Sequence, residues 1–469
     1  MPTNVKQKFI DFFEGYWFPV YIAFNVITGH IFNMINYGVV MITLATCIAF
    51  ILCKDLKFFL SPLLCFYFIF SKKSLADETL YSIPSIIFFS LCITALVLCI
   101  VAHFVINKKD IKLKRFTSSS LFFGFIAIVA VFLLNGFFAF ADYKKENIIF
   151  GILIAISFVL PFFIFSINLR IDKKTVNYLI YVFLITSIII IVEFIHMYLT
   201  DLYVHSNGHI FKDSIDLGWG VSNNIGAILA MLMPFHFYCA VKARYSIPFF
   251  VSGVMCYAII ILTMSRTSII IATLILALCL GFVCIYKHKN IMINRFSVIA
   301  FLILVTVILM VFEDKLSNAF YQIMDSHNLF DGSGRSSYYS DGINKFLSNP
   351  FLGAGFGNSH GVNDRFVISA PEYYHNTIIQ MLGSCGIVGL FAYCFHRFQT
   401  VMLFIKNRSS VSFFMGMSIL SLLLTSLLDI HLFNIFPAIF YSVILCIFER
   451  DTKFKQQQKL KKLEHLNNH

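Results

Sequence analysis

Three polar side chains lie outside the long apolar stretches or at their ends. Arg266 is in "MSRTS", Arg335 in "GSGRSS", and His375 in "YYHNTIIQ", with Glu372 three residues earlier. Guanidinium groups bind phosphate oxygens through paired hydrogen bonds, and a histidine at a helix start can serve as a general base. These residues suit chemistry on a phosphate-bearing substrate if the fold brings them together. The plainer alternatives are headgroup anchoring for Arg266 and a structural helix-end role for His375.

The stretch "GAGFGNSHG", from Gly353 to Gly361, resembles a loop that cradles phosphate. A dinucleotide site needs G-x-G-x-x-G between a strand and a helix, and a P-loop needs Gly-Lys followed by Ser or Thr. Neither pattern is present, so we do not expect a nucleotide site. A tight turn is one interpretation. The other is a loop that packs against a bulky ligand, with Gly355 and Gly357 in contact with it.

Weaker candidates also lie near the ends of apolar stretches. Arg365 is a further arginine outside those stretches, and Asn223 and Asn224 open an apolar run, where they can simply cap a helix. Two pairs of acid and histidine, and one histidine of the glycine-rich stretch, complete the set: Glu193 with His196, Asp429 with His431, and His360.

The amino-acid composition indicates which kind of secondary structure must position these residues. The chain has 469 residues, of which 59% are hydrophobic and only 13% are charged, against about 25% charged in a soluble domain. Apolar runs of about 18 residues or more recur throughout, which predicts a multi-pass membrane protein. The runs are continuous and not alternating, so helices are expected instead of a barrel. All 12 cysteines lie inside these runs, which argues against disulfides and metal sites.

The sequence predicts an all-α bundle of 12 to 14 transmembrane helices. The apolar runs cover residues 17–34, 36–53, 57–71, 82–106, 118–141, 148–168, 177–199, 220–241, 247–264, 267–286, 296–312, 375–395, 411–428 and 431–448. We expect four regions: a bundle over 1–312, a large ordered outer loop over 313–374, three last spans over 375–448, and a basic cytoplasmic tail over 449–469. Within the loop, "YYSDGINKFLSNP" predicts a helix that ends at Pro350.

The charge distribution predicts the orientation. If the N-terminus is inside, 26 of the 36 Lys and Arg residues fall in the inner segments, as the positive-inside rule requires. Both termini are then cytoplasmic, and Arg266, Arg335 and His375 face outward. The net charge of +12 is thus a signal of topology and of contact with anionic lipid, and does not indicate nucleic-acid binding.

The order of these motifs resembles a known family. "MSRTS", then "GSGRSSYYSDGINKFLSNPFLGAGFGNSHG", then "HNTIIQMLGSCGIVGL" is similar to the O-antigen polymerase and O-antigen ligase superfamily of bacterial membrane proteins. The resemblance is closest over 265–395, and "GVSNNIGAILAMLMPF" adds to it. His375, Asn376, Gly386 and Gly389 keep the family's spacing, whereas Leu390 replaces the Ser or Thr that ligases often have.

The resemblance implies an inner-membrane glycosyltransferase of the GT-C kind. Its donor would be an oligosaccharide on undecaprenyl pyrophosphate at the outer face, and it would need no metal and no other cofactor. Arg266 and Arg335 would hold the pyrophosphate, His375 would assist the acceptor hydroxyl, and Asn376 would belong to the same motif. A chain-length regulator and a flippase of the same pathway would be its partners.

Three functions stay open on the sequence. A polymerase joins lipid-linked repeat units, a ligase moves the finished glycan to lipid A core or protein, and a flippase only transports it. The "GR…NPFLGAGFGN" block and Leu390 favour polymerase over ligase. A transporter tends to show internal repeats and ionisable groups near mid-membrane, whereas here the polar candidates lie at one face.

Overall fold

The structure is a computed structural model that describes residues 3–70, 83–139, 146–170, 173–201, 205–206, 209–210, 212–311, 313, 335–357 and 373–467. It is an all-α membrane protein, as predicted. The first half contains α1 (Thr3–Phe13), α2 (Trp17–Ile31), α3 (Ile35–Leu52), α4 (Leu60–Cys65), α6 (Ile83–Ile106), α7 (Lys114–Thr117), α8 (Phe122–Leu133), α9 (Glu146–Asn168) and α10 (Lys173–Thr200). The second half contains α11 (Ser222–Lys242), α12 (Ile247–Leu262), α13 (Arg266–Ile285), α14 (Ile291–Val311), α16 (Arg335–Ser348), α17 (Thr377–Ile405), α18 (Ser410–Leu428) and α19 (Ile435–Asn467).

Each of the 14 predicted apolar runs forms helix. In the described part of the chain, nine helices are long and apolar enough to cross a membrane, and one bent pair brings this to ten. Two further apolar helices, Leu56–Ile69 and Ile247–Leu262, are shorter. With both shorter helices the count is twelve, the lower limit of the expected 12 to 14 spans.

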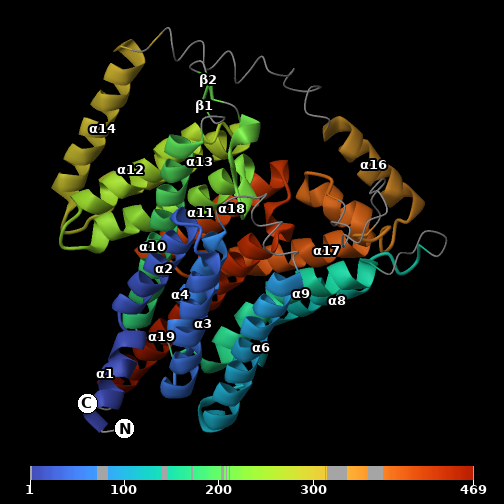
Figure 1. The fold of residues 1–469 in the computed structure, drawn as a ribbon, viewed down its shortest axis with the longest axis horizontal. Coiled ribbons are helices and arrows are strands. Elements are labelled where there is room, and N and C mark those ends of the chain that lie inside the picture. The colour runs from blue at the N-terminus through green and yellow to red at the C-terminus, as the bar shows by residue number, and fades with distance from the viewer. Residues whose placement is uncertain are drawn as a thin grey trace.

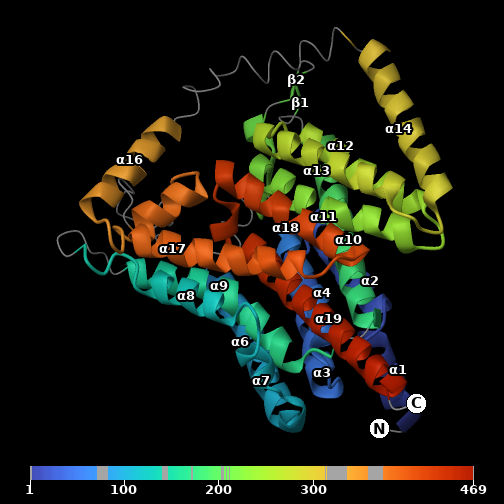
Figure 2. The ribbon, with the colours of Figure 1, turned by 180° about the vertical axis from the view of Figure 1, so that it is seen from behind.

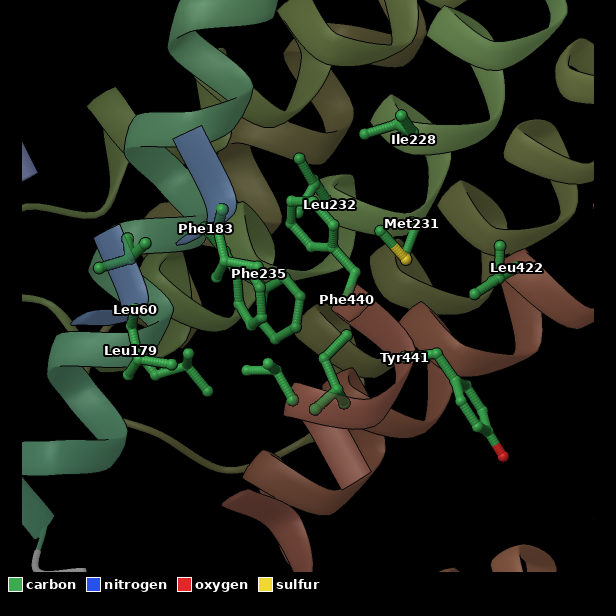
Figure 3. Close-up of a cluster of buried hydrophobic side chains, with 14 of the residues drawn as sticks. Leu60, Leu179, Phe183, Ile228, Met231, Leu232, Phe235, Leu422, Phe440 and Tyr441 are labelled. Carbon is green, nitrogen blue, oxygen red and sulfur yellow. The ribbon is translucent and has the colours of Figure 1, made fainter. Parts of the chain in front are cut away.

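The core of the bundle surrounds α11, which is buried along almost its whole length. A helix that is apolar on all sides belongs inside a bundle. Figure 3 shows Phe183 of α10, Phe235 of α11 and Phe440 of α19 in one apolar cluster, and Phe183 contacts both other rings. The rings of Phe183 and Phe235 are stacked with their centroids 4.6 Å apart, and Phe440 lies 5.7 Å from Phe183. This packing fixes α11, whose first turn carries Asn223 and Asn224.

Both termini lie at the same end of the molecule, and α16 lies far from them (Figures 1 and 2). The expected basic tail is not a separate segment, because α19 continues to Asn467. Between α10 and α11 the chain forms two short antiparallel hairpins, β1 (His205–Ser206) with β2 (His209–Ile210) and β3 (Asp216–Leu217) with β4 (Gly220–Val221). The predicted helix before Pro350 is confirmed as α16.

The long helix α17 is broken at Gly386, where φ is +67°. On one side of the break, the carbonyl oxygens of Gly383 and Ser384 accept hydrogen bonds from the N–H groups of Ala354 (2.8 Å) and Gly355 (3.0 Å). On the other side, the N–H groups of Ile387 and Val388 donate to the carbonyl oxygens of Pro350 (2.8 Å) and Phe351 (3.3 Å).

The segment after α16 therefore replaces the helical hydrogen bonds that α17 loses at its break. Such replacement is required inside a membrane, where backbone groups have no water to bond. Glycines at a spacing of three residues on a helix, as at Gly383, Gly386 and Gly389, usually indicate close helix packing. The structure gives Gly386 a different role: α17 breaks there, and the segment after α16 forms hydrogen bonds on both sides of the break.

Candidate active site

The start of α17 holds His375 in an unusual backbone conformation. His375 has φ of +48° and is one of three non-glycine residues with positive φ in the described ranges. The side-chain oxygen of Asn376 caps the helix by accepting hydrogen bonds from the N–H groups of Ile378 (2.9 Å) and Ile379 (3.1 Å). The hydroxyl of Tyr339 donates to the His375 carbonyl at 3.4 Å. Left-handed backbone is costly for a residue with a side chain and is concentrated at functional sites.

The carboxylate of Asp429, just after α18, connects the predicted residues. Its Oδ1 lies 3.0 Å from Nδ1 of His375, and its Oδ2 lies 3.9 Å from the guanidinium of Arg335. Asn223 donates to Oδ2 at 3.3 Å, and Nε2 of His431 lies 3.8 Å from it. One buried carboxylate thus joins residues from α11, α16, the segment just before α17 and the turn after α18.

Arg335, the first residue of α16, is held by two acceptors at the same end of α18. Besides Asp429, its guanidinium donates to the carbonyl oxygen of Leu428 at 2.9 Å. That carbonyl is among the last of α18, which have no partner within the helix and attract cations. The side chain keeps 27% of its surface exposed, so part of the guanidinium can still meet a ligand.

Arg266 begins α13 after a tight turn in which Met264 has φ of +54°. The turn is tied to α11, because the hydroxyl of Ser268 donates to the carbonyl of Asn223 at 3.5 Å. Lys212, in the short 3₁₀ helix Lys212–Ser214, is a third cation in this area. Partial desolvation lowers the pKa of the Lys212 ammonium, and the positive charges of Arg335 and Arg266 lower it further.

The Asp429 carboxyl is held in its ionised form. Burial alone would raise its pKa, but the hydrogen bond from His375 and the charges of His431 and His375 outweigh burial, so the pKa lies below its usual value. The same charge keeps His375 oriented. A hydrogen bond from Nδ1–H to Asp429 leaves Nε2 of His375 with a lone pair for a substrate hydroxyl.

Asn224 lies next to this cluster but binds a protein group. Its side-chain oxygen is 3.1 Å from Nδ1 of His431. His431 is buried, and burial lowers its pKa, although the Asp429 charge acts in the opposite direction. Asn224 thus positions His431 against Asp429, which is a different role from the helix cap that the sequence also allowed.

Gly355 and Gly357 pack against protein instead of leaving a cradle for phosphate. All five N–H groups from Gly353 to Gly357 donate to acceptors within the chain. The Phe356 and Gly357 N–H groups donate to the side-chain oxygens of Asn135 (3.0 Å) and Asn147 (2.6 Å). A Cβ on Gly355 would approach the Asn147 side chain to 2.2 Å. Over residues 353–357, the described part of this stretch, the chain therefore forms a tight turn bonded to the rest of the protein.

Two of the predicted residues, Arg365 and Glu372, and also His360, lie outside the described residues. The sequence named Asp429, His431 and Asn223 only as weak candidates, and it gave Lys212 no role. The sequence feature that could have identified them is their position. Each lies close to the end of an apolar run, on the side predicted to face outward. Their convergence on one carboxylate depends on contacts over long sequence separations.

The fold and this cluster define a multi-pass membrane protein with one arginine and two histidines around one buried carboxylate. Residues 250–394 match the family model described as O-Antigen ligase, and this match places the segment in the O-antigen polymerase and ligase superfamily. The matched segment is less than half of the chain and contains Arg266, Arg335 and His375; Asp429 and Lys212 lie outside it. No curated protein matched the chain.

Proposed function

We propose that the protein is a polymerase that joins oligosaccharide repeat units carried on undecaprenyl pyrophosphate, at the outer face of the bacterial inner membrane. The superfamily is a class of membrane glycosyltransferase-like enzymes that act on lipid-linked oligosaccharides, which supports this substrate. The observation that carries the proposal is the Asp429 carboxylate, which joins His375 and Arg335 in one polar cluster.

The cations supply the site for the leaving group. The positive charges of Arg335 and Arg266 act on Lys212, and the carboxylates of Asp213 and Asp429 oppose them. These cations would attract an anionic leaving group. As the bond from the anomeric carbon to the pyrophosphate oxygen breaks, negative charge grows on the pyrophosphate, and preorganised cations stabilise it. The proposal includes no metal or other cofactor.

His375 prepares the acceptor. Its Nε2 accepts the proton of the attacking hydroxyl while Asp429 holds Nδ1–H and stabilises the positive charge that develops on the ring. The acceptor oxygen bonds to the anomeric carbon from the side opposite the departing pyrophosphate, so the configuration inverts. The products are the extended glycan on its carrier lipid and free undecaprenyl pyrophosphate.

A ligase would use the same donor and the same groups, and differs only in its acceptor. Leu390, where ligases often have Ser or Thr, is the sequence feature that favours polymerase. A flippase is a weaker candidate, because transporters tend to carry ionisable groups near mid-membrane, whereas the polar candidates here are predicted at one face. We place both termini in the cytoplasm, in agreement with their position at one end of the molecule (Figure 1).

The test compares Arg335→Ala and His375→Ala with Arg244→Ala, in which the same change removes an arginine that lies over Tyr245, far from the cluster in sequence. We expect polymer formation by purified protein from a lipid-linked repeat to fall by about 10²- to 10³-fold in the first two variants. Arg244→Ala should stay close to the unchanged protein. Undiminished polymer in Arg335→Ala and His375→Ala would remove them from the mechanism.

Cells that lack the gene separate the candidate functions. Loss of a polymerase leaves lipopolysaccharide with a single repeat unit, whereas loss of a ligase leaves bare core and polymer on the carrier lipid. If vesicles that contain the purified protein move a lipid-linked glycan across the bilayer without forming a glycosidic bond, the protein is a flippase and not a polymerase.

A further inference from the structure

A second cavity lies far in the sequence from the Asp429 cluster, between the end of α6, the end of α9 and the connection from α6 to α8. Its volume is about 750 Å³. The walls are apolar and include Phe104 of α6 and Phe163 of α9, and the remaining lining includes three lysines, Lys108, Lys112 and Lys114. An apolar cavity with cations at its edge is complementary to a molecule with an apolar tail and a negatively charged head.

The connection that carries the lysines has the geometry of a segment at the membrane surface. The helical stretch Lys108–Thr117 makes an angle of 85° with Phe122–Leu133. A basic amphipathic stretch at a right angle to a span lies in the interface, with its apolar side chains toward the acyl chains. The N–H of Lys112 donates to the carbonyl of Ile167 in α9 at 3.0 Å, which fixes this stretch against the cavity.

The lysines of the cavity have no carboxylate within 4 Å among the described residues. The acidic side chain of the same connection, Asp110, is paired with Arg170 at 2.8 Å. All three lysine residues are exposed, so their ammonium groups can reach a ligand. Basic pockets of this kind, on the side of the membrane where cations are concentrated, bind the headgroups of anionic lipids.

We propose that this cavity binds one anionic phospholipid of the surrounding leaflet, with an acyl chain against Phe104 and Phe163 and the headgroup phosphate on Lys108, Lys112 and Lys114. A zwitterionic lipid fits the apolar walls but gains little from three cations. A soluble anion fits the cations but not the walls. The site is independent of the proposed polymerase reaction.

The test uses the full-length protein in bilayer nanodiscs that contain equal amounts of dioleoyl phosphatidylglycerol and dioleoyl phosphatidylcholine. Native mass spectrometry then counts the lipids that remain bound. We expect phosphatidylglycerol to be retained over phosphatidylcholine. The combined variant Lys108→Gln, Lys112→Gln and Lys114→Gln should weaken its retention by roughly a hundredfold, since each lysine near the surface contributes about one kcal/mol.

A matched control removes the same charge elsewhere. The combined variant Lys287→Gln, Lys289→Gln and Lys406→Gln changes three lysines outside the cavity and should retain phosphatidylglycerol as the unchanged protein does. Replacing the three cavity lysines by arginine keeps the charge and should keep binding. Ile111→Trp, which fills the cavity, should lower the retention of both lipids, and this variant tests the site even if the glutamine variant folds poorly.

Three results would overturn the proposal. The first is equal retention of phosphatidylglycerol and phosphatidylcholine. The second is the same loss in the control variant as in the cavity variant. The third is displacement of phosphatidylglycerol by an equal amount of undecaprenyl phosphate, which would assign the cavity to the carrier lipid.

Discussion

Asp429 has more ionisable partners than any other acidic residue described in the candidate site, and each partner depends on its negative charge in a different way. His375 uses it to fix a tautomer, Arg335 uses it to balance a partly buried cation, and His431 lies against it while buried. Removing one member of a buried charged group leaves the others uncompensated. A substitution at Asp429 should therefore reduce activity more than the loss of any one of these contacts would.

Asp429→Asn keeps the size of the side chain and removes its charge. We expect the rate of polymer formation to fall by roughly 10²- to 10⁴-fold, because an amide neither stabilises a charged His375 nor selects its tautomer reliably. The measurement is the initial rate with purified protein and a lipid-linked repeat unit. Asp341→Asn is the control, since Asp341 forms an ion pair with Lys345 one helical turn away and has no ion pair with another described residue. Equal rates for the two variants would contradict the role of Asp429.

His431 predicts a pH dependence of stability. Burial lowers its pKa in the folded protein, Asp429 opposes this effect, and Arg335 and His375 add to it. The unfolded chain, with an ordinary histidine pKa near 6.5, then binds the proton more readily than the folded protein. The contribution of His431 to the free energy of unfolding is therefore fully present above about pH 6.5 and decreases as the pH falls below it. For one proton the decrease is at most about 1.4 kcal/mol per pH unit. Asp429, whose pKa is lowered, loses its contribution only below about pH 4.

The measurement is the unfolding temperature at pH 8 and pH 5.5 for the unchanged protein and for His431→Asn. The asparagine can still donate to Asn224 but does not titrate. We expect the unchanged protein to lose more stability between the two pH values than the variant does. If both lose the same amount, His431 does not titrate on unfolding in this range.

At the scale of elements, the broken α17 and the segment from Pro350 to Gly357 form one unit. Gly386→Ala introduces a Cβ that would approach the carbonyl oxygen of Phe351 to 2.2 Å, at a residue with positive φ. We expect a loss of about 2–5 kcal/mol in the free energy of unfolding. The control is Gly281→Ala in α13, where no atom lies within 4 Å of the added Cβ; helix propensity there should leave stability unchanged or raise it by up to about 1 kcal/mol.

A calibrated denaturant titration in detergent measures both changes. Because α17 begins two residues after His375, Gly386→Ala should also reduce polymer formation. Equal stability of Gly386→Ala and Gly281→Ala would show that the loop is not needed to complete the broken helix.

The sequence predicted the positions of the helices better than it predicted the helix break and the contacts between segments. Each apolar run correctly located a helix, and Pro350 marked the end of α16. Both signals are local in the sequence. The break at Gly386 has no local signal that separates it from the packing glycines Gly383 and Gly389. Its partner segment is held by Asn135 and Asn147, more than 200 residues earlier in the chain, and such pairing follows from tertiary structure.

The candidate site shows the same contrast between what the sequence predicts and what depends on tertiary contacts. Residue type alone selected Arg266, Arg335 and His375, because charged groups among apolar runs are costly and indicate function. It also selected Gly355, Gly357 and Asn376, to which the structure gives packing and capping roles. A sequence shows which groups can donate or accept hydrogen bonds. It does not show whether the protein itself already uses them.

For the whole molecule, the two termini limit the number of membrane crossings. They lie at one end (Figures 1 and 2), which agrees with the predicted even number of crossings. In the described part of the chain, nine helices pass the length and hydropathy criteria. The bent pair makes ten, and the two shorter apolar helices would make twelve, which is the lower limit of the predicted range.

Cysteine labelling tests this topology. Lys6→Cys and Lys459→Cys place a thiol near each terminus, and Ser336→Cys places one on α16, all at exposed residues. A charged maleimide that does not cross membranes should label Ser336→Cys in intact spheroplasts. It should label the other two only after permeabilisation, because the basic segments stay inside. The unchanged protein gives the background from its 12 cysteines. Labelling of only one terminus in intact cells would make the number of crossings odd, and labelling of both would place the Asp429 cluster on the cytoplasmic side, where a polymerase of exported glycan has no substrate.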